Sequence, residues 1–292
     1  MLTINPKEVS TGELHQHLLG AVAPRPICFA STISKDGQPN LAPYSFFNAF
    51  SSNPPTLVFS SNRRVKDNTT KDTLHNVIEQ GEVVINVVSY SIVHQMAATS
   101  IDFPTNVSEF TKAGLTPIPS DIVKPFRVKE SPVQMECKVK NIISLGEHGG
   151  AGNLIICEVV RMHIDENILD EEGKIDPQKI DLMGRMGRAF YCRAKGDNIM
   201  KIFQPVNEIG IGVDSLPESV RLSKVLTGND LGRLGRLPQM PTSQEINERK
   251  ATKEITALQH IKGKPHAEIL HQIAQKLIAQ NKVKEALVTL FC

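Results

Sequence analysis

The segment from Val133 to Lys140 has the most regular alternation of apolar and polar residues in the chain, and this alternation limits how the chain can fold. The apolar members are Val133, Met135, Cys137 and Val139, and the polar members are Gln134, Glu136, Lys138 and Lys140. A period of two is typical of a β-strand that packs one face on a core and turns the other towards water. We therefore expect a strand here with a wet polar face.

Further β-type segments lie on both sides of this strand, at residues 27–33, 41–42, 56–60, 83–88 and 154–164. Turn sequences at 34–37 and 53–55 separate them, and the glycine-rich segment 146–152 is interpreted as the flexible tip of a hairpin. This segment is not a dinucleotide-binding fingerprint, because a strand rather than a helix follows the glycines. Short strands joined mostly by turns favour an antiparallel barrel over a doubly wound sheet.

Helical patterns are fewer before residue 195 and dominate after it. One helix is expected to begin near Asp72, with Thr69 or Thr70 as its cap and Gly81 after its last turn, and a short one is expected within 91–100. A loop rich in Pro, Thr and Ser follows this short helix and runs through residue 120. We therefore expect a mostly β domain with peripheral helices over residues 1–195.

Residues 196–292 are expected to form a C-terminal helical extension. Capping-box sequences at 215–218 and 242–245 predict two helix starts, the first helix running to about Leu226. Apolar residues at helical spacing in 269–278 and 283–290 predict two antiparallel helices joined across Asn281. Packing on the barrel is the favoured role of this extension, and a dimer contact or a docking surface are the alternatives.

Composition argues against several classes of protein. The 292 residues carry a net charge of only +2 and include no run long enough to span a bilayer, so neither nucleic acid nor a membrane is expected as a partner. The N-terminus lacks the layout of a signal peptide, and the five cysteines form no Cys-x-x-Cys pair, which favours reduced thiols in a cytoplasmic protein. His15-x-His17 is the nearest approach to a metal site, and no metal is expected.

A loop rich in hydrogen-bond donors and positive charge precedes the helix expected at Asp72. Its members are Ser60, Ser61, Asn62, Arg63, Arg64, Lys66, Thr69, Thr70, Lys71 and Thr73. Because a helix N-terminus presents unpaired N–H groups and a partial positive charge, such a loop can bind a phosphate. A capped helix whose basic residues merely face water is the alternative. The chain lacks a Walker-type Gly-Lys-Ser/Thr, so a nucleoside triphosphate in a P-loop is not expected.

Several short motifs together resemble the flavin reductase-like, FMN-binding split-barrel family over residues 20–195. They are Arg25-Pro26-Ile27, the segment Pro43 to Asn48, Ser51-x-x-Pro54-Pro55, Ser60 to Arg64, Lys71-Asp72-Thr73, and Arg188 with Tyr191. The resemblance implies a six-stranded Greek-key split β-barrel. It also implies a homodimer that holds FMN near the subunit interface.

The resemblance implies functional residues as well. The expected flavin-binding residues are Pro43, Tyr44, Ser45, Phe46, Phe47, Asn48, Ser60, Ser61, Asn62, Arg63, Lys71, Asp72 and Thr73. The second half of this set would hold the phosphate, and backbone groups of 45–48 would line the edge of the flavin ring. His148 and Tyr191 are the catalytic candidates. Each also has a structural interpretation, His148 as a turn residue and Tyr191 as a packed aromatic.

The activity implied by the resemblance is hydride transfer from NADH or NADPH to flavin, with a partner oxygenase or redox protein as a candidate acceptor. This chemistry needs no general acid, nucleophile or metal, in line with a sequence that shows no triad. Two alternatives remain open. One is an FMN-containing electron-transfer flavoprotein that uses a protein donor, and the other is a non-catalytic flavin-binding module whose helical tail recognises a partner.

Overall fold

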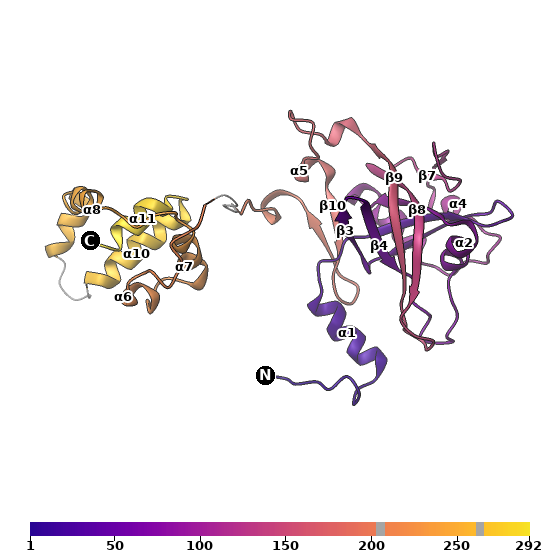
Figure 1. Ribbon diagram of the computed structural model, residues 1–292, viewed down its shortest axis with the longest axis horizontal. Helices are drawn as coiled ribbons and strands as arrows, with labels where there is room; N and C mark the ends of the chain where they lie inside the picture. Colours follow the sequence, from indigo (N-terminus) through magenta and orange to yellow (C-terminus); the bar gives the residue numbers. More distant parts are fainter. Residues whose placement is uncertain (203–207, 261–265) are drawn as a thin grey trace. The chain divides into compact units, whose positions relative to one another are not determined.

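The computed structural model describes residues 1–202, 208–260 and 266–292. The chain divides into two compact units, Met1–Met200 and Lys201–Cys292. This division falls shortly after residue 195, where the sequence changes from strand to helix patterns. Each unit is described by itself below (Figure 1).

Seven antiparallel strands form the main sheet of the first unit, in the order β2-β1-β5-β8-β9-β4-β3. Their bounds are β1 (Cys28–Ile33), β2 (Pro39–Tyr44), β3 (Phe47–Ser52), β4 (Pro55–Ser60), β5 (Glu82–Val87), β8 (Val133–Ser144) and β9 (Asn153–Ile164). Two small antiparallel pairs accompany the sheet, β6 (Pro117–Ile118) with β7 (Arg127–Val128) and β10 (Leu182–Arg185) with β11 (Tyr191–Ala194). The strands expected from the sequence are all present.

The two outer strands of the sheet, β2 and β3, are consecutive in the sequence and are separated only by Ser45 and Phe46. One bent segment therefore forms both ends of the sheet, and the sheet must roll up to bring these ends together, as in a barrel. Counted with β2 and β3 as one bent strand, the barrel has the six strands that the resemblance implies. The mostly β, split-barrel fold class is confirmed.

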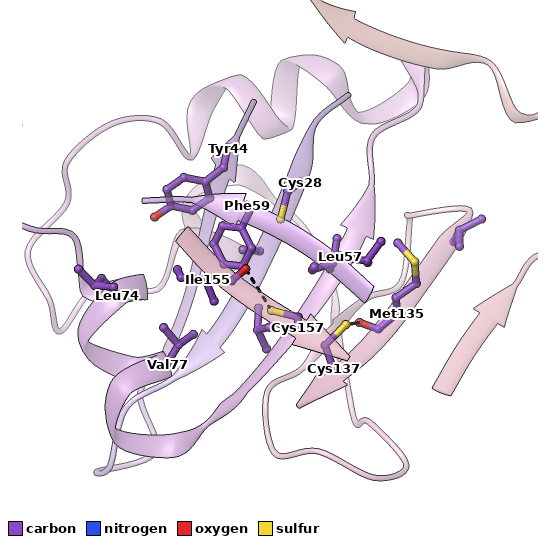
Figure 2. Packing of buried hydrophobic residues seen from close by; sticks show 14 of the residues in the cluster. Cys28, Tyr44, Leu57, Phe59, Leu74, Val77, Met135, Cys137, Ile155 and Cys157 are labelled. Carbon is purple, nitrogen blue, oxygen red and sulfur yellow. Dashed lines mark hydrogen bonds between the residues drawn. The ribbon is translucent and has the colours of Figure 1, made fainter. Parts of the chain in front are cut away.

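The barrel core is filled by side chains from alternate strand positions, among them Phe59 and Ile155, which are fully buried (Figure 2). Three cysteines, Cys28, Cys137 and Cys157, lie in the same cluster. Burial raises the pKa of all three thiols, that of Cys157 to about 12. These cysteines therefore act as small apolar core residues, as expected.

The expectation that β8 has a wet polar face is wrong for the first half of the strand. Gln134 and Glu136 are 7% and 0% exposed, and only the positions from Lys138 onwards reach solvent. The backbone N–H groups of residues 121–123 donate to the Glu136 carboxylate at 2.7–3.1 Å, and His163 Nε2 lies 2.7 Å from it. Burial pushes the pKa of Glu136 up, but these four donors outweigh it and hold the pKa at about 2.

Short helices surround the barrel: α1 (Thr11–Ala21), η1 (Tyr90–Ile92), α2 (Asp72–Gln80), α3 (Val93–Ala98), α4 (Glu109–Ala113), η2 (Glu166–Ile168), α5 (Pro177–Ile180) and η3 (Gly196–Asn198). α2 begins at Asp72 and ends before Gly81, as expected, and it contacts β1, β2 and β5. Its N-cap is Lys71, without a side-chain cap, so the expected capping by Thr69 or Thr70 is wrong. α4 lies in a segment that we expected to be loop.

The second unit has its own apolar core, which includes Leu234, Ile278 and Leu287. Its helices are α6 (Glu218–Arg221), α7 (Gly228–Gly235), α8 (Ser243–Lys250), α9 (Lys253–Thr256), η4 (Ala257–His260), α10 (His266–Ala279) and α11 (Val283–Thr289). α10 and α11 pair across Asn281, as expected. No helix in the described part of the chain combines the length and apolar character needed to cross a membrane.

The two expected capping boxes of this unit have different outcomes. The box at Thr242 forms and starts α8. The box expected at Ser215 does not form, because Pro217 occupies the N-cap position and α6 ends at Arg221 instead of Leu226. A capping box that we did not predict, at Thr227 and Asp230, starts α7 instead.

Candidate functional site

The donor-rich loop and the glycine-rich hairpin tip are joined by backbone hydrogen bonds. Arg63 N–H donates to the Ala151 carbonyl (2.9 Å), Gly150 N–H donates to the Arg63 carbonyl (3.0 Å), and Ser61 N–H donates to the Asn153 carbonyl (3.1 Å). These bonds continue the pairing of β4 with β9 beyond the strand ends. The hairpin tip is therefore held against the loop in this structure.

Two glycines make this close approach possible. A Cβ at Gly152 would lie 2.6 Å from Ser60 Oγ, and one at Gly149 would lie 3.0 Å from the Val65 carbonyl oxygen. Neither distance is compatible with a side chain unless the loop moves away. The glycine cluster is thus a packing surface for the loop.

The two arginines of the loop are occupied by hydrogen bonds that shape it. Arg63 donates to the side chain and the carbonyl of Asn68 at 2.7 and 3.0 Å. Arg64 donates to the Thr70 carbonyl (2.9 Å) and pairs with Asp102 (2.8 Å), and this pairing raises the pKa of Arg64. Both side chains therefore stabilise the loop's conformation.

Lys71 differs from these arginines. Among the residues that the structure describes, its ammonium group has no hydrogen bond or ion pair, and it lies 5.4 Å from the centre of the Tyr44 ring. Burial lowers the pKa of Lys71, since little protein charge compensates the ammonium group. A half-buried cation of this kind is well suited to accept an anionic ligand.

A pocket of about 310 Å³ opens beside this lysine. Eight of the predicted flavin-binding residues line it: Pro43, Tyr44, Ser45, Phe46, Ser60, Asn62, Arg63 and Lys71. Thr11, His15, Val65 and Gly150 complete the wall. Thr11 and His15 share one face of α1 at a spacing of four residues, and the His15 ring lies 6.2 Å from that of Phe46. Sequence reasoning missed them, because it considered His15 only as a metal ligand.

The hydroxyl groups of Tyr44 and Ser61 are buried, and in the described part of the chain neither has a partner that meets the usual hydrogen-bond geometry. Burial raises the pKa of Tyr44 to about 12, and the nearby hydroxyls of Thr73 and Ser61 offset only part of that rise. Buried polar atoms in proteins are nearly always paired. Because the Tyr44 hydroxyl lies near those of Ser61 and Thr73, these groups can pair with one another, and Ser61 does not line the pocket.

The remaining predicted binding residues lie elsewhere. Asp72 and Thr73 line a separate cavity of about 40 Å³ with Lys71, and the Thr73 hydroxyl accepts a hydrogen bond from Asn40 (2.9 Å). Phe47 and Asn48 belong to the edge strand β3 and line neither cavity. The structure thus brings the loop and the β2–β3 bend together, but it places the start of α2 on the other side of Lys71.

The two catalytic candidates occupy different places. His148 is exposed at the hairpin tip and does not line the 310 Å³ pocket. Tyr191, at the start of β11, lines an adjoining pocket of about 140 Å³ that shares Pro43, Tyr44 and Ser45 with the first. The two side chains therefore do not meet in one pocket.

A larger cavity of about 500 Å³ lies near Arg127 and His163, and none of the predicted site residues line it. Asp121, Glu136 and His163 beside it bring potential metal-binding atoms within 4.8 Å of one another. However, each Glu136 oxygen already accepts two hydrogen bonds. We therefore interpret this cluster as an anchor for residues 121–123, and we place the candidate site at the pocket beside Lys71.

Comparison with known proteins agrees with this fold. The model of the flavin reductase like domain matches residues 20–182. A protein from Aquifex aeolicus is 40% identical over 196 residues, which are 67% of this chain and 97% of that protein. The structure of nitrilotriacetate monooxygenase component B from Bacillus cereus is 34% identical and has a TM-score of 0.63, over 70% of this chain and 98% of that one.

A protein from Shewanella frigidimarina with a split barrel domain shares the fold at 24% identity, with a TM-score of 0.59 over 70% of this chain and all of that one. The chain belongs to the flavin reductase-like family, and its first unit is a split barrel. The second unit, Lys201–Cys292, lies outside the residues that the family model matches.

Proposed function

We propose that this protein is an FMN-binding oxidoreductase of flavin reductase type, which transfers hydride from NADH or NADPH to flavin. One observation carries the proposal: the unpaired ammonium of Lys71 lies beside a pocket that joins the donor-rich loop to the β2–β3 bend.

The residues around the pocket divide into two groups. Ser60, Asn62 and Lys71 would hold the phosphate, and Arg63 would keep the loop in place through Asn68. Backbone groups of the bend between β2 and β3 would line the flavin ring, because an irregular stretch between two strands leaves N–H and C=O groups free for a ligand.

FMN, when bound, would supply the ring that accepts the hydride, while the protein binds and orients it. The N–H groups of the bend beside the ring would favour electron uptake, because reduction adds negative charge to the ring. α1, which carries Thr11 and His15, would limit the access of water to the pocket.

The similarity to a monooxygenase component supports a role in supplying reduced flavin to a partner oxygenase. We also propose a homodimer formed next to the flavin pocket. Phe46, which lines the pocket, and Phe50 on the edge strand β3 are 40% and 68% exposed. Covering two large aromatic side chains would favour association. Analytical ultracentrifugation of the wild-type protein and of Phe50→Ser tests this, since a monomeric wild type would contradict it.

Steady-state oxidation of NADH and NADPH with added FMN tests the proposed activity. We expect turnover well above that of heat-treated protein, and a lower kcat/KM for FMN in Lys71→Ala. Bound flavin in the absorbance spectrum without NAD(P)H oxidation would contradict hydride transfer from nicotinamide and favour a protein electron donor.

A further inference from the structure

The pocket around Tyr191 has a composition of its own. It measures about 140 Å³ and adjoins the flavin pocket through Pro43, Tyr44 and Ser45. The other residues that line it are Ile27, Met96, Ser100, Arg185 and Tyr191. Among the described residues the lining thus includes a basic side chain and no acidic one, which points to an anionic ligand.

Arg185 is the basic side chain, and its charge is uncompensated. Its guanidinium group lies 4.5 Å from the centre of the Tyr191 ring, and it has no hydrogen bond or ion pair with any residue the structure describes. Arg193, on the partner strand of the same hairpin, instead binds Asp181 with two hydrogen bonds of 2.7 and 2.6 Å. Stacking on Tyr191 holds Arg185 in place and leaves its N–H donors free for a ligand.

A second arginine, Arg25, neighbours Arg185 but does not line the pocket. Arg25 is only 5% exposed, and its backbone pairs with that of Arg185 at 2.8 and 2.9 Å. Its guanidinium donates to the carbonyls of Leu19, Val22 and Met186 and to Ser45 Oγ. These neutral acceptors satisfy the donors but not the charge. Burial and then the charge of Arg185 lower the pKa of Arg25, as expected for two neighbouring cations.

The rest of the pocket is mixed, because Ile27, Pro43 and Met96 form an apolar wall and Ser45 and Ser100 add hydroxyl groups. Ile27 and Met96 are 6% and 1% exposed, and Pro43 lies beside them in the lining. A volume of about 150 Å³ is large enough for a single benzene ring. The volume and the apolar wall therefore fit a small ring that packs on Ile27 and Met96, with an anionic group directed at Arg185.

We propose that this pocket is a subsite for a small aromatic carboxylate, whose carboxylate pairs with Arg185 and whose ring packs against Tyr191, Ile27 and Met96. The planar guanidinium matches a carboxylate with two parallel hydrogen bonds. Because the pocket shares the β2–β3 bend with the flavin site, the ligand would be a co-substrate of the flavin. That role rests on the proposed function, whereas anion binding does not.

Isothermal titration with benzoate and with its neutral analogue benzamide tests the subsite, in the full-length protein with and without FMN. Benzoate should bind the wild type at least about tenfold more tightly than benzamide, since a charged hydrogen bond contributes about 1.5–3 kcal/mol. Arg185→Gln should lose this preference and Arg185→Lys should keep part of it. Arg188→Gln is the matched control, because Arg188 is exposed on the same hairpin and does not line the pocket.

Equal affinity for benzoate and benzamide in the wild type would overturn the proposal whatever the variants do. So would an unchanged preference in Arg185→Gln, or an equal loss in Arg188→Gln. A separate FMN titration distinguishes the anion subsite from the proposed function. If FMN does not bind while benzoate binds through Arg185, the proposed function fails and the anion subsite stands.

Discussion

The ammonium group of Lys71 lies 5.4 Å from the centre of the Tyr44 ring, whose own hydroxyl is buried near those of Ser61 and Thr73. This pair joins the N-cap of α2 to the last residue of β2, the point where the barrel strand bends. A phosphate bound here would gain a charge-assisted hydrogen bond from Lys71. A flavin without a phosphate would not.

Replacing Lys71 by Ala should weaken FMN binding by about 10- to 150-fold, the equivalent of a charged hydrogen bond of about 1.5–3 kcal/mol. Riboflavin, which lacks the phosphate, should lose little affinity. Fluorescence titration of both ligands measures the difference. Lys66→Ala, an exposed change in the same loop, is the control. Equal losses for FMN and riboflavin would place the phosphate elsewhere.

Gly152→Ala should disturb the site by pushing Ser60 away from the hairpin, since the new Cβ would lie 2.6 Å from Ser60 Oγ. We expect weaker FMN binding and a loss of about 1–3 kcal/mol in the free energy of unfolding, as is usual for overpacking. Gly12→Ala in α1 makes the same change where no atom lies within 4 Å. If both variants bind FMN like the wild type, the hairpin does not shape the pocket.

Glu136→Gln should lower the free energy of unfolding at pH 7 by on the order of 3 kcal/mol, because an amide group would face backbone N–H donors. The folded pKa of Glu136, about 2, is below its ordinary 4.5. Its contribution is therefore complete above pH 4.5 and is lost as the pH falls towards 2. Urea unfolding at several pH values should show the difference between wild type and variant shrinking across this range. A difference that stays constant would contradict the low pKa.

Removing residues 201–292 should leave FMN affinity within about twofold of the full-length value. All the residues of the candidate site lie in the first unit, and each unit has its own core. Titration of FMN into the truncated chain measures the affinity, with circular dichroism to check that the barrel is folded. A large loss of affinity in a folded barrel would show that the helical unit contributes to the site.

The sequence predicted the strands well because their signals are local. The alternation in β8, the apolar run of β5 and the turns between strands each lie within a few residues. It did not show that β2 and β3 occupy opposite ends of the sheet, since strand order depends on long-range pairing. The same limit explains Glu136, whose burial depends on residues 121–123 folding over a face that alternation alone marks as wet.

The sequence predicted only part of the candidate site, because some of its features depend on contacts between distant residues. The donor-rich loop and the bend at Ser45 are visible as motifs, and the structure brings both to one pocket. Composition could not show that Arg63 is hydrogen-bonded to Asn68 whereas the Lys71 ammonium is available to a ligand. Arg63 and Lys71 look alike in the sequence, because both are basic residues of one loop. Arg185 was passed over for the same reason, since only its contacts distinguish it from Arg193.

A crystal structure of the protein soaked in excess FMN tests the central claim most directly. We predict electron density for FMN in the 310 Å³ pocket, with its phosphate within hydrogen-bond distance of Lys71 and Ser60 and its ring along the bend between β2 and β3. An empty pocket, or FMN bound with its phosphate away from Lys71, would contradict the account.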